Sequence, residues 1–144
     1  AYSKKDFNWI KRVIKQLKRY IFGSIFIVIL MYLISDWFYS IWIGESIRVD
    51  NMLSLFMGIY VVIFCYLLIF AHFLNGVGKL RIQIIVNSIA SIINIPLSYF
   101  FASTSMGISG IIFATICSLT FVCIFTVIQS NKIINNTAIG IWNK

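Results

Sequence analysis

The stretch FAHFLNGVGKLRIQ, residues 70–83, separates two long apolar runs and decides the fold. It contains Asn75, then Gly76 and Gly78 two residues apart, and then Lys79. Glycine adopts positive φ at little steric cost, so the two glycines favour a tight turn between helices. We therefore predict a turn at the cytoplasmic surface of a membrane, with all four of these residues in it. GVGK lacks the GxxxxGK[ST] spacing of a phosphate-binding loop.

The composition is that of a membrane protein. Of the 144 residues, 60% are hydrophobic and 11% are charged, whereas a soluble domain is about 45–50% apolar and about 25% charged. The three cysteines lie in apolar runs without CxxC spacing, which favours buried side chains over a disulfide or metal site. With four acidic residues and one histidine, the chain offers no catalytic constellation. We expect no enzyme, no metal and no cofactor.

Four segments have the roughly 20 apolar residues that a membrane span requires. They are residues 20–43, 52–74, 80–101 and 107–128, preceded by a basic segment, 1–19, and followed by a tail, 129–144. A backbone in lipid must satisfy its own hydrogen bonds, and the runs do not alternate polar and apolar residues, so helices are predicted rather than a barrel. The predicted fold class is an all-α, polytopic integral membrane protein with four transmembrane helices.

The distribution of cations predicts the orientation. The net charge is +8, and seven of the twelve Lys and Arg lie in the first 19 residues. The flanks and loops carry 7, 1, 2, 0 and 2 cations in order, which places both termini and the Lys79 turn in the cytoplasm. Residues 7–21 have apolar side chains at helical spacing and are predicted to form a basic amphipathic helix on the inner leaflet. Such a segment favours membrane lipid over nucleic acid as the partner. An ordinary positive-inside flank and a specific lipid-binding role are both compatible with it.

Two ionisable residues within the predicted spans are candidates for ion or proton coupling. Asp36 is the only acidic residue inside a predicted span, but it lies near the outer end, beside Trp37, Tyr39 and Trp42. His72, the only histidine, precedes the cytoplasmic turn by one helical turn. Each of these residues has two interpretations: an ordinary side chain at the membrane interface, or a residue that couples transport to an ion or proton.

A polar stripe runs along the third predicted helix, with spacings of four, four, three and four residues. It consists of Gln83, Asn87, Ser91, Asn94 and Ser98. Pro96 lies within it and leaves the Ile92 carbonyl without its helical donor, which predicts a kink. Two interpretations remain open: the stripe binds neighbouring helices by hydrogen bonds, or it lines a cavity for a polar substrate.

Small residues follow one side of the fourth predicted helix. They are Gly107, Gly110, Ala114 and Ser118, and the last three are four residues apart. Such a ridge lets two helix backbones approach closely. We therefore predict a role in helix packing.

Several stretches, in order, closely resemble the C-terminal part of Wzx-type polysaccharide flippases, which belong to the multidrug/oligosaccharidyl-lipid/polysaccharide exporter superfamily. IWIG is followed by LNGVGKLRIQ, IINIPLS and MGISGIIFATI. The patterns LNGxGKxxxQ, INIPLS and GxxGxxxAT of that family correspond here to residues 74–83, 93–98 and 107–115. Each motif alone is weak, but the ordered set is fairly specific.

The resemblance implies a MATE-like fold of 12–14 helices, in two bundles around a central cavity. It implies translocation of undecaprenyl-pyrophosphate-linked oligosaccharide across the bacterial plasma membrane, for O-antigen, capsule or exopolysaccharide. The chain would then be the C-terminal part of a longer protein. Its partners would be the lipid-linked oligosaccharide, the remaining N-terminal helices of the same protein and the polysaccharide polymerase machinery. The family cavity is usually basic, whereas no Lys or Arg lies in the interior of a predicted span here.

Two other functions are compatible with the sequence. One is an intact small four-helix transporter that acts as an oligomer, such as a GtrA-like carrier or a small multidrug exporter. A small multidrug exporter would be expected to carry a glutamate in its first span, and none is present in residues 20–43. The other is a membrane subunit of a polysaccharide assembly complex, with no transport activity of its own.

Overall fold

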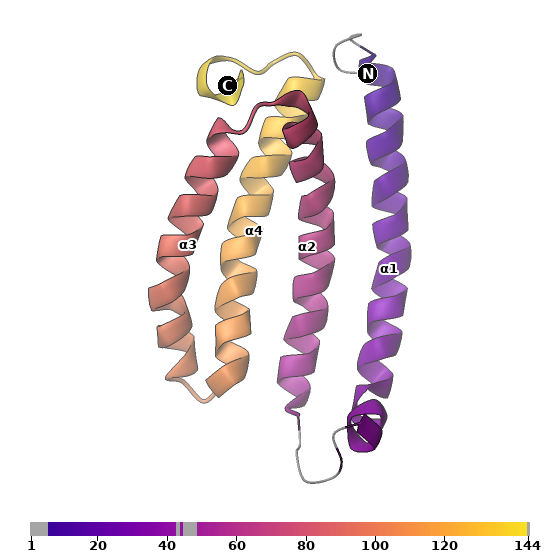
Figure 1. Ribbon diagram of the computed structural model, residues 1–144, viewed down its shortest axis with the longest axis vertical. Coiled ribbons are helices and arrows are strands. Elements are labelled where there is room, and N and C mark those ends of the chain that lie inside the picture. The colour runs from indigo at the N-terminus through magenta and orange to yellow at the C-terminus, as the bar shows by residue number, and fades with distance from the viewer. Residues whose placement is uncertain (1–5, 43, 45–48, 144) are drawn as a thin grey trace.

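The computed structural model describes residues 6–42, 44 and 49–143. Within them the chain forms α1 (Phe7–Trp42), α2 (Asn51–Val77), α3 (Arg81–Ala102), α4 (Gly107–Ile134) and a short 3-10 helix, η1 (Gly140–Asn143) (Figure 1). Each of the four long helices is long and apolar enough to cross a membrane, by length and composition. The predicted all-α fold with four membrane-spanning helices is confirmed.

Successive helices run in opposite directions, so the chain crosses the bundle four times (Figure 1). The start of α1, the α2–α3 turn and the end of α4 lie at one end of the bundle, which we call the turn end. The α3–α4 connection, residues 103–106, lies at the opposite end, which we call the loop end. This arrangement is the one that the alternating cation counts predict for four spans.

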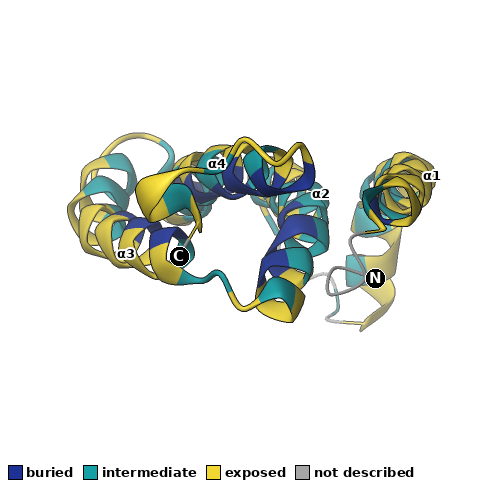
Figure 2. Cartoon of the chain, turned by 90° about the horizontal axis from the view of Figure 1, so that it is seen from above, coloured by how far each residue is buried: buried dark blue, intermediate teal, exposed yellow. Residues whose placement is uncertain are grey.

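The core lies between α2, α3 and α4. Its buried residues are Leu67, Ile82, Val86, Ala90, Val122 and Cys123. Helix α4 packs against both α2 and α3, whereas α1 contacts mainly α2. Seen from above, α1 stands beside the other three helices (Figure 2), and Ile10 is its one buried residue among those described. The large apolar side chains of α1, such as Phe22 with 79% of its surface exposed, are those of a helix facing lipid or further protein.

The N-terminal basic segment and the first span form one continuous helix. Helix α1 begins at Phe7, where the carboxylate of Asp6 accepts a 3.0 Å hydrogen bond from the Trp9 amide. Such a cap satisfies one of the free amides of the first turn. The first glycine of α1 is Gly23, so no residue before it breaks the helix. Residues 7–19 therefore continue the helix of the first span and do not form a separate helix (Figure 1).

The C-terminal residues fold back onto the bundle. Helix α4 ends at Ile134, six residues beyond the predicted span, and Asn136 follows with φ of 57°. Trp142 of η1 packs against the core, and the ammonium of Lys132 lies 4.1 Å from the centre of its ring. This cation–π contact holds η1 across the ends of α3 and α4.

Candidate functional site: the polar stripe of α3

The stripe lies beside the buried face of α3, not on it. The buried residues of this helix are Ile82, Val86 and Ala90. The first three residues of the stripe come directly after them in the sequence: Gln83, Asn87 and Ser91. A step of one residue turns a helix by about 100°. The stripe therefore starts at the edge of the α3–α4 interface, where a side chain can face either the neighbouring helix or the surroundings.

At the loop end, the stripe forms hydrogen bonds between helices. The side-chain oxygen of Asn94 accepts a 3.2 Å bond from the Ser118 hydroxyl of α4 and a 3.4 Å bond from the Ser98 hydroxyl. Ser118 belongs to the small-residue ridge, so the two predicted features meet here. This half of the stripe therefore joins α3 to α4 by hydrogen bonds.

At the turn end, the stripe is open. Asn87 and Ser91 are exposed, and the Asn87 amide donates a 2.7 Å bond to the backbone carbonyl of Gln83 on its own helix. The side-chain oxygen of Gln83 is buried without a hydrogen-bond partner among the described residues. The Asn87 side-chain oxygen and the Ser91 hydroxyl therefore form no hydrogen bond with another described helix.

Pro96 lies in the loop-end half and is exposed. Helix α3 continues through it from Arg81 to Ala102, with the proline inside the helix. The proline removes one backbone donor, and an exposed side of the helix tolerates that loss better than a packed one.

The small-residue ridge of α4 packs against α3. A side chain at Gly110 would bring its Cβ to 2.5 Å from the backbone oxygen of Phe101. Ala114 is fully buried, and Ser118 makes the bond to Asn94 described above. Gly107 has φ of 51° and starts the helix. The closest approach is thus at Gly110, near the loop end.

The α2–α3 turn, which contains Gly78 and Lys79, is held by α4 and η1. Gly78 has φ of 75°, its amide donates to the Leu74 carbonyl at 2.9 Å, and the Lys79 amide donates to the same carbonyl at 3.2 Å. These bonds close α2 as a left-handed glycine cap does. The buried amide of Gln129 donates to the Lys79 carbonyl at 3.1 Å, and the Lys79 ammonium donates to Asn143. Asn75 and Gly76 were predicted in the turn but are exposed residues of the last turn of α2, because only Gly78 has the positive φ that ends the helix.

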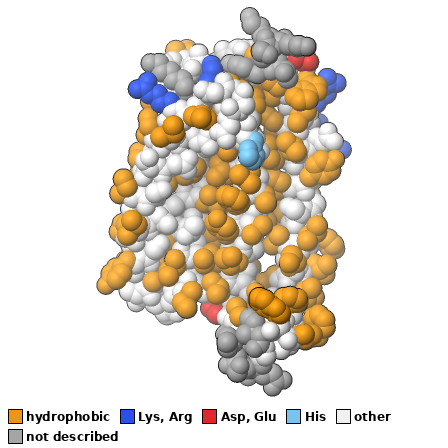
Figure 3. Space-filling model, in the orientation of Figure 1, with side chains coloured by type: hydrophobic (Ala, Val, Ile, Leu, Met, Phe, Trp, Pro, Cys, Tyr) orange, Lys and Arg blue, Asp and Glu red, His pale blue; other side chains and the backbone are white. Residues whose placement is uncertain are grey.

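The two coupling candidates are not brought together. Asp36 is an exposed residue of α1 toward the loop end, and His72 is an exposed residue of α2 toward the turn end. Figure 3 shows the histidine on the apolar side of the bundle, below the cations that gather at the turn end. No group of three or more His, Cys, Asp or Glu able to hold a metal occurs among the described residues.

Asp50 has a role that the charge count did not predict. Its carboxylate accepts a 3.1 Å bond from the Met52 amide and a 2.9 Å bond from the hydroxyl of Ser109, which is 2% exposed. One side chain thus caps α2 and ties it to the start of α4. The local signal was an acidic residue just before the apolar run of α2, which is typical of a helix cap.

A family model described as MatE matches residues 1–100, which is most of the 144-residue chain. The chain belongs to the MatE family. MatE proteins are membrane transporters and not enzymes, so a multi-pass membrane protein of the exporter class is indicated. The match covers α1, α2 and most of α3, and it ends before the ridge of α4. No curated protein and no solved structure matches the chain significantly.

Proposed function

We propose that this MatE chain is the C-terminal part of a flippase that moves undecaprenyl-pyrophosphate-linked oligosaccharide across the bacterial plasma membrane. Membership of an exporter family supports the transport class. The ordered motifs that resemble Wzx-type flippases support the substrate class. The positive-inside rule supports cytoplasmic termini.

The observation that carries the proposal is the open half of the α3 stripe. Asn87 and Ser91 are exposed on a membrane-spanning helix. Ionisable side chains in a membrane almost always face the interior of a bundle or a water-filled cavity, and our proposal extends this rule to asparagine and serine. This half of the stripe therefore faces a polar cavity that further helices complete, while Asn94 serves the contact with α4.

Amide and hydroxyl groups suit an uncharged sugar. An asparagine side chain both donates and accepts hydrogen bonds, as sugar hydroxyls do. These groups replace the water around the sugar without binding it too tightly to release. The pyrophosphate of the substrate needs cations, which the interiors of these four spans lack, so those cations come from the rest of the parent protein.

The test compares Asn87→Leu with Asn94→Leu in the parent protein, in a strain that lacks its own flippase. Asn87→Leu should leave the membrane amount of protein unchanged and lower the surface polysaccharide made per molecule. Asn94→Leu should lower the amount of folded protein by removing the bond to Ser118, worth about 0.6 kcal/mol on average for such bonds. Immunoblotting of membranes and surface-glycan staining separate the two effects.

A control and a second measurement complete the test. Ile92 is an exposed apolar residue of α3, about 140° around the helix from Asn87, so Ile92→Leu should change neither quantity. Unchanged activity per molecule in Asn87→Leu would remove the stripe from the mechanism. Restoration of surface polysaccharide by the 144-residue chain alone would instead favour the small oligomeric transporter.

A further inference from the structure

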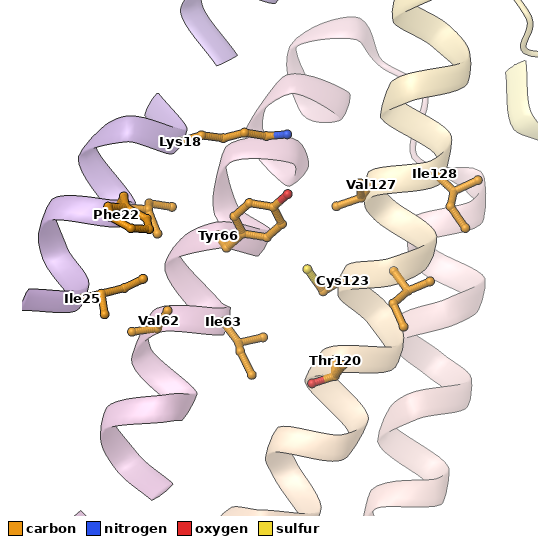
Figure 4. A pocket seen from close by; sticks show the side chains of 12 residues that line it. Lys18, Phe22, Ile25, Val62, Ile63, Tyr66, Thr120, Cys123, Val127 and Ile128 are labelled. Carbon is orange, nitrogen blue, oxygen red and sulfur yellow. The ribbon is translucent and has the colours of Figure 1, made fainter. Parts of the chain in front are cut away.

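An apolar groove lies between α1, α2 and α4 near the turn end. It has a volume of about 550 Å³. Figure 4 shows Phe22 and Ile25 of α1 on one side of it, Tyr66 of α2 at its back and Cys123 of α4 on the other side. The ammonium of Lys18 lies above the groove (Figure 4), 5.0 Å from the centre of the Phe70 ring. A cation therefore stands at the mouth of a hydrocarbon-lined space.

A second hollow continues from the mouth toward the turn end. It has a volume of about 230 Å³ and is lined by Lys11, Ile14, Lys15, Lys18, Asn131, Ile134 and Asn135. The three lysines follow a helical spacing of four and three residues, so they share one face of α1. Among the described residues, no Asp or Glu lines either hollow. The mouth thus presents three cations and two amides to whatever occupies the groove.

The groove also continues away from the mouth, along the seam of α1 and α2. A further hollow of about 270 Å³ reaches from Ile25 to Tyr32 on α1 and shares Val62 and Ile63 with the first. From Lys18 to Tyr32 the helix rises about 21 Å. One leaflet of the hydrocarbon core is about 15 Å deep. The groove is thus about 6 Å longer than the hydrocarbon depth of one leaflet, so its charged end reaches the level of the headgroups.

We propose that α1, α2 and α4 form a binding site for one anionic phospholipid of the leaflet at the turn end. The phosphate lies between Lys15 and Lys18, with Lys11 beside it, and the amide of Asn131 donates to its oxygens. One acyl chain lies in the groove against Tyr66. Charge complementarity selects an anionic headgroup over a zwitterionic one, and this inference does not depend on the proposed substrate.

The headgroup is tested with the purified 144-residue chain in detergent, by native mass spectrometry. Phosphatidylglycerol and phosphatidylcholine with the same acyl chains are added in equal amounts, and phosphatidylglycerol should be retained preferentially. The double variant Lys15→Gln, Lys18→Gln should weaken its retention by about twentyfold or more, since each basic residue near an anionic lipid surface contributes about 1 kcal/mol. The matched control is Arg12→Gln, Arg19→Gln, which removes two charges from the same helix and lines neither hollow.

The groove is tested on the unaltered chain, so that folding of a variant is not in question. Phosphatidylglycerol with a photoreactive group in one acyl chain should label the peptides around Tyr66 and Cys123. Cys117, one of the exposed residues of α4, should lie outside the labelled stretch. Equal retention of the two lipids, equal loss in the arginine control, or labelling mainly around Cys117 would overturn the proposal. So would preferential retention of an isoprenoid phosphate, or a cross-link between two copies of the chain through the groove.

Discussion

Among the glycines, Gly110 is the one at which packing leaves the least room for a side chain. An added Cβ would lie 2.5 Å from the Phe101 oxygen and 2.6 Å from the Phe101 carbonyl carbon. Both atoms belong to backbone, so they cannot move aside as a flexible side chain would. We expect Gly110→Ala to destabilise the chain by about 1–3 kcal/mol, the usual cost of overpacking. The measurement is unfolding of the purified chain by sodium dodecyl sulfate in mixed micelles.

Gly23 is the matched control for Gly110. It also lies inside a long helix, but a Cβ there meets nothing within 4 Å. Gly23→Ala should be neutral or slightly stabilising, because alanine favours a helix by roughly 1 kcal/mol over glycine. Equal unfolding of Gly110→Ala and the unaltered chain would contradict the close approach of α3 and α4.

At the scale of elements, the α2–α3 turn depends on the left-handed conformation of Gly78. Alanine at φ of 75° places its Cβ too close to the backbone, at a cost of about 1–2 kcal/mol. Gly78→Ala should therefore lower the unfolding midpoint, whereas Gly78→Asn should restore much of it, since asparagine tolerates this conformation. Gly76→Ala, in the last helical turn with open space around it, should be neutral. A midpoint in Gly78→Ala equal to that of Gly76→Ala would show that the turn has another conformation.

The elements were predictable from sequence, and the contacts that close them were not. Apolar runs locate α2 and α3 within three residues at either end, because lipid demands a continuous helix. The same runs underestimate α4, which ends at Ile134, because a helix continues past the hydrocarbon until a cap stops it. The bond from Asp50 to Ser109 and the stacking of Lys132 on Trp142 join residues without any periodic relation. A local sequence pattern therefore cannot predict these two contacts.

For the candidate site, the sequence located the polar stripe. It could not show which half of the stripe contacts α4 and which half stays exposed. Spacing alone puts Asn87 and Asn94 on one face of α3. Only the arrangement of helices shows that Asn94 meets Ser118 while Asn87 remains exposed. The groove below Lys18 was also beyond sequence reasoning, because its walls come from three helices.

At the scale of the whole molecule, the orientation in the membrane is the property that the proposals share. The structure places the α2–α3 turn and the α3–α4 connection at opposite ends, and the positive-inside rule assigns the turn end to the cytoplasm. In a background with its three cysteines replaced, Ser105→Cys should react with an impermeant maleimide in intact cells. Gly76→Cys, exposed at the other end, should react only after lysis, since the membrane then no longer excludes the reagent. The reverse labelling pattern would show that the chain has the opposite orientation in the membrane. The lysine-lined end of the lipid groove would then lie in the outer leaflet.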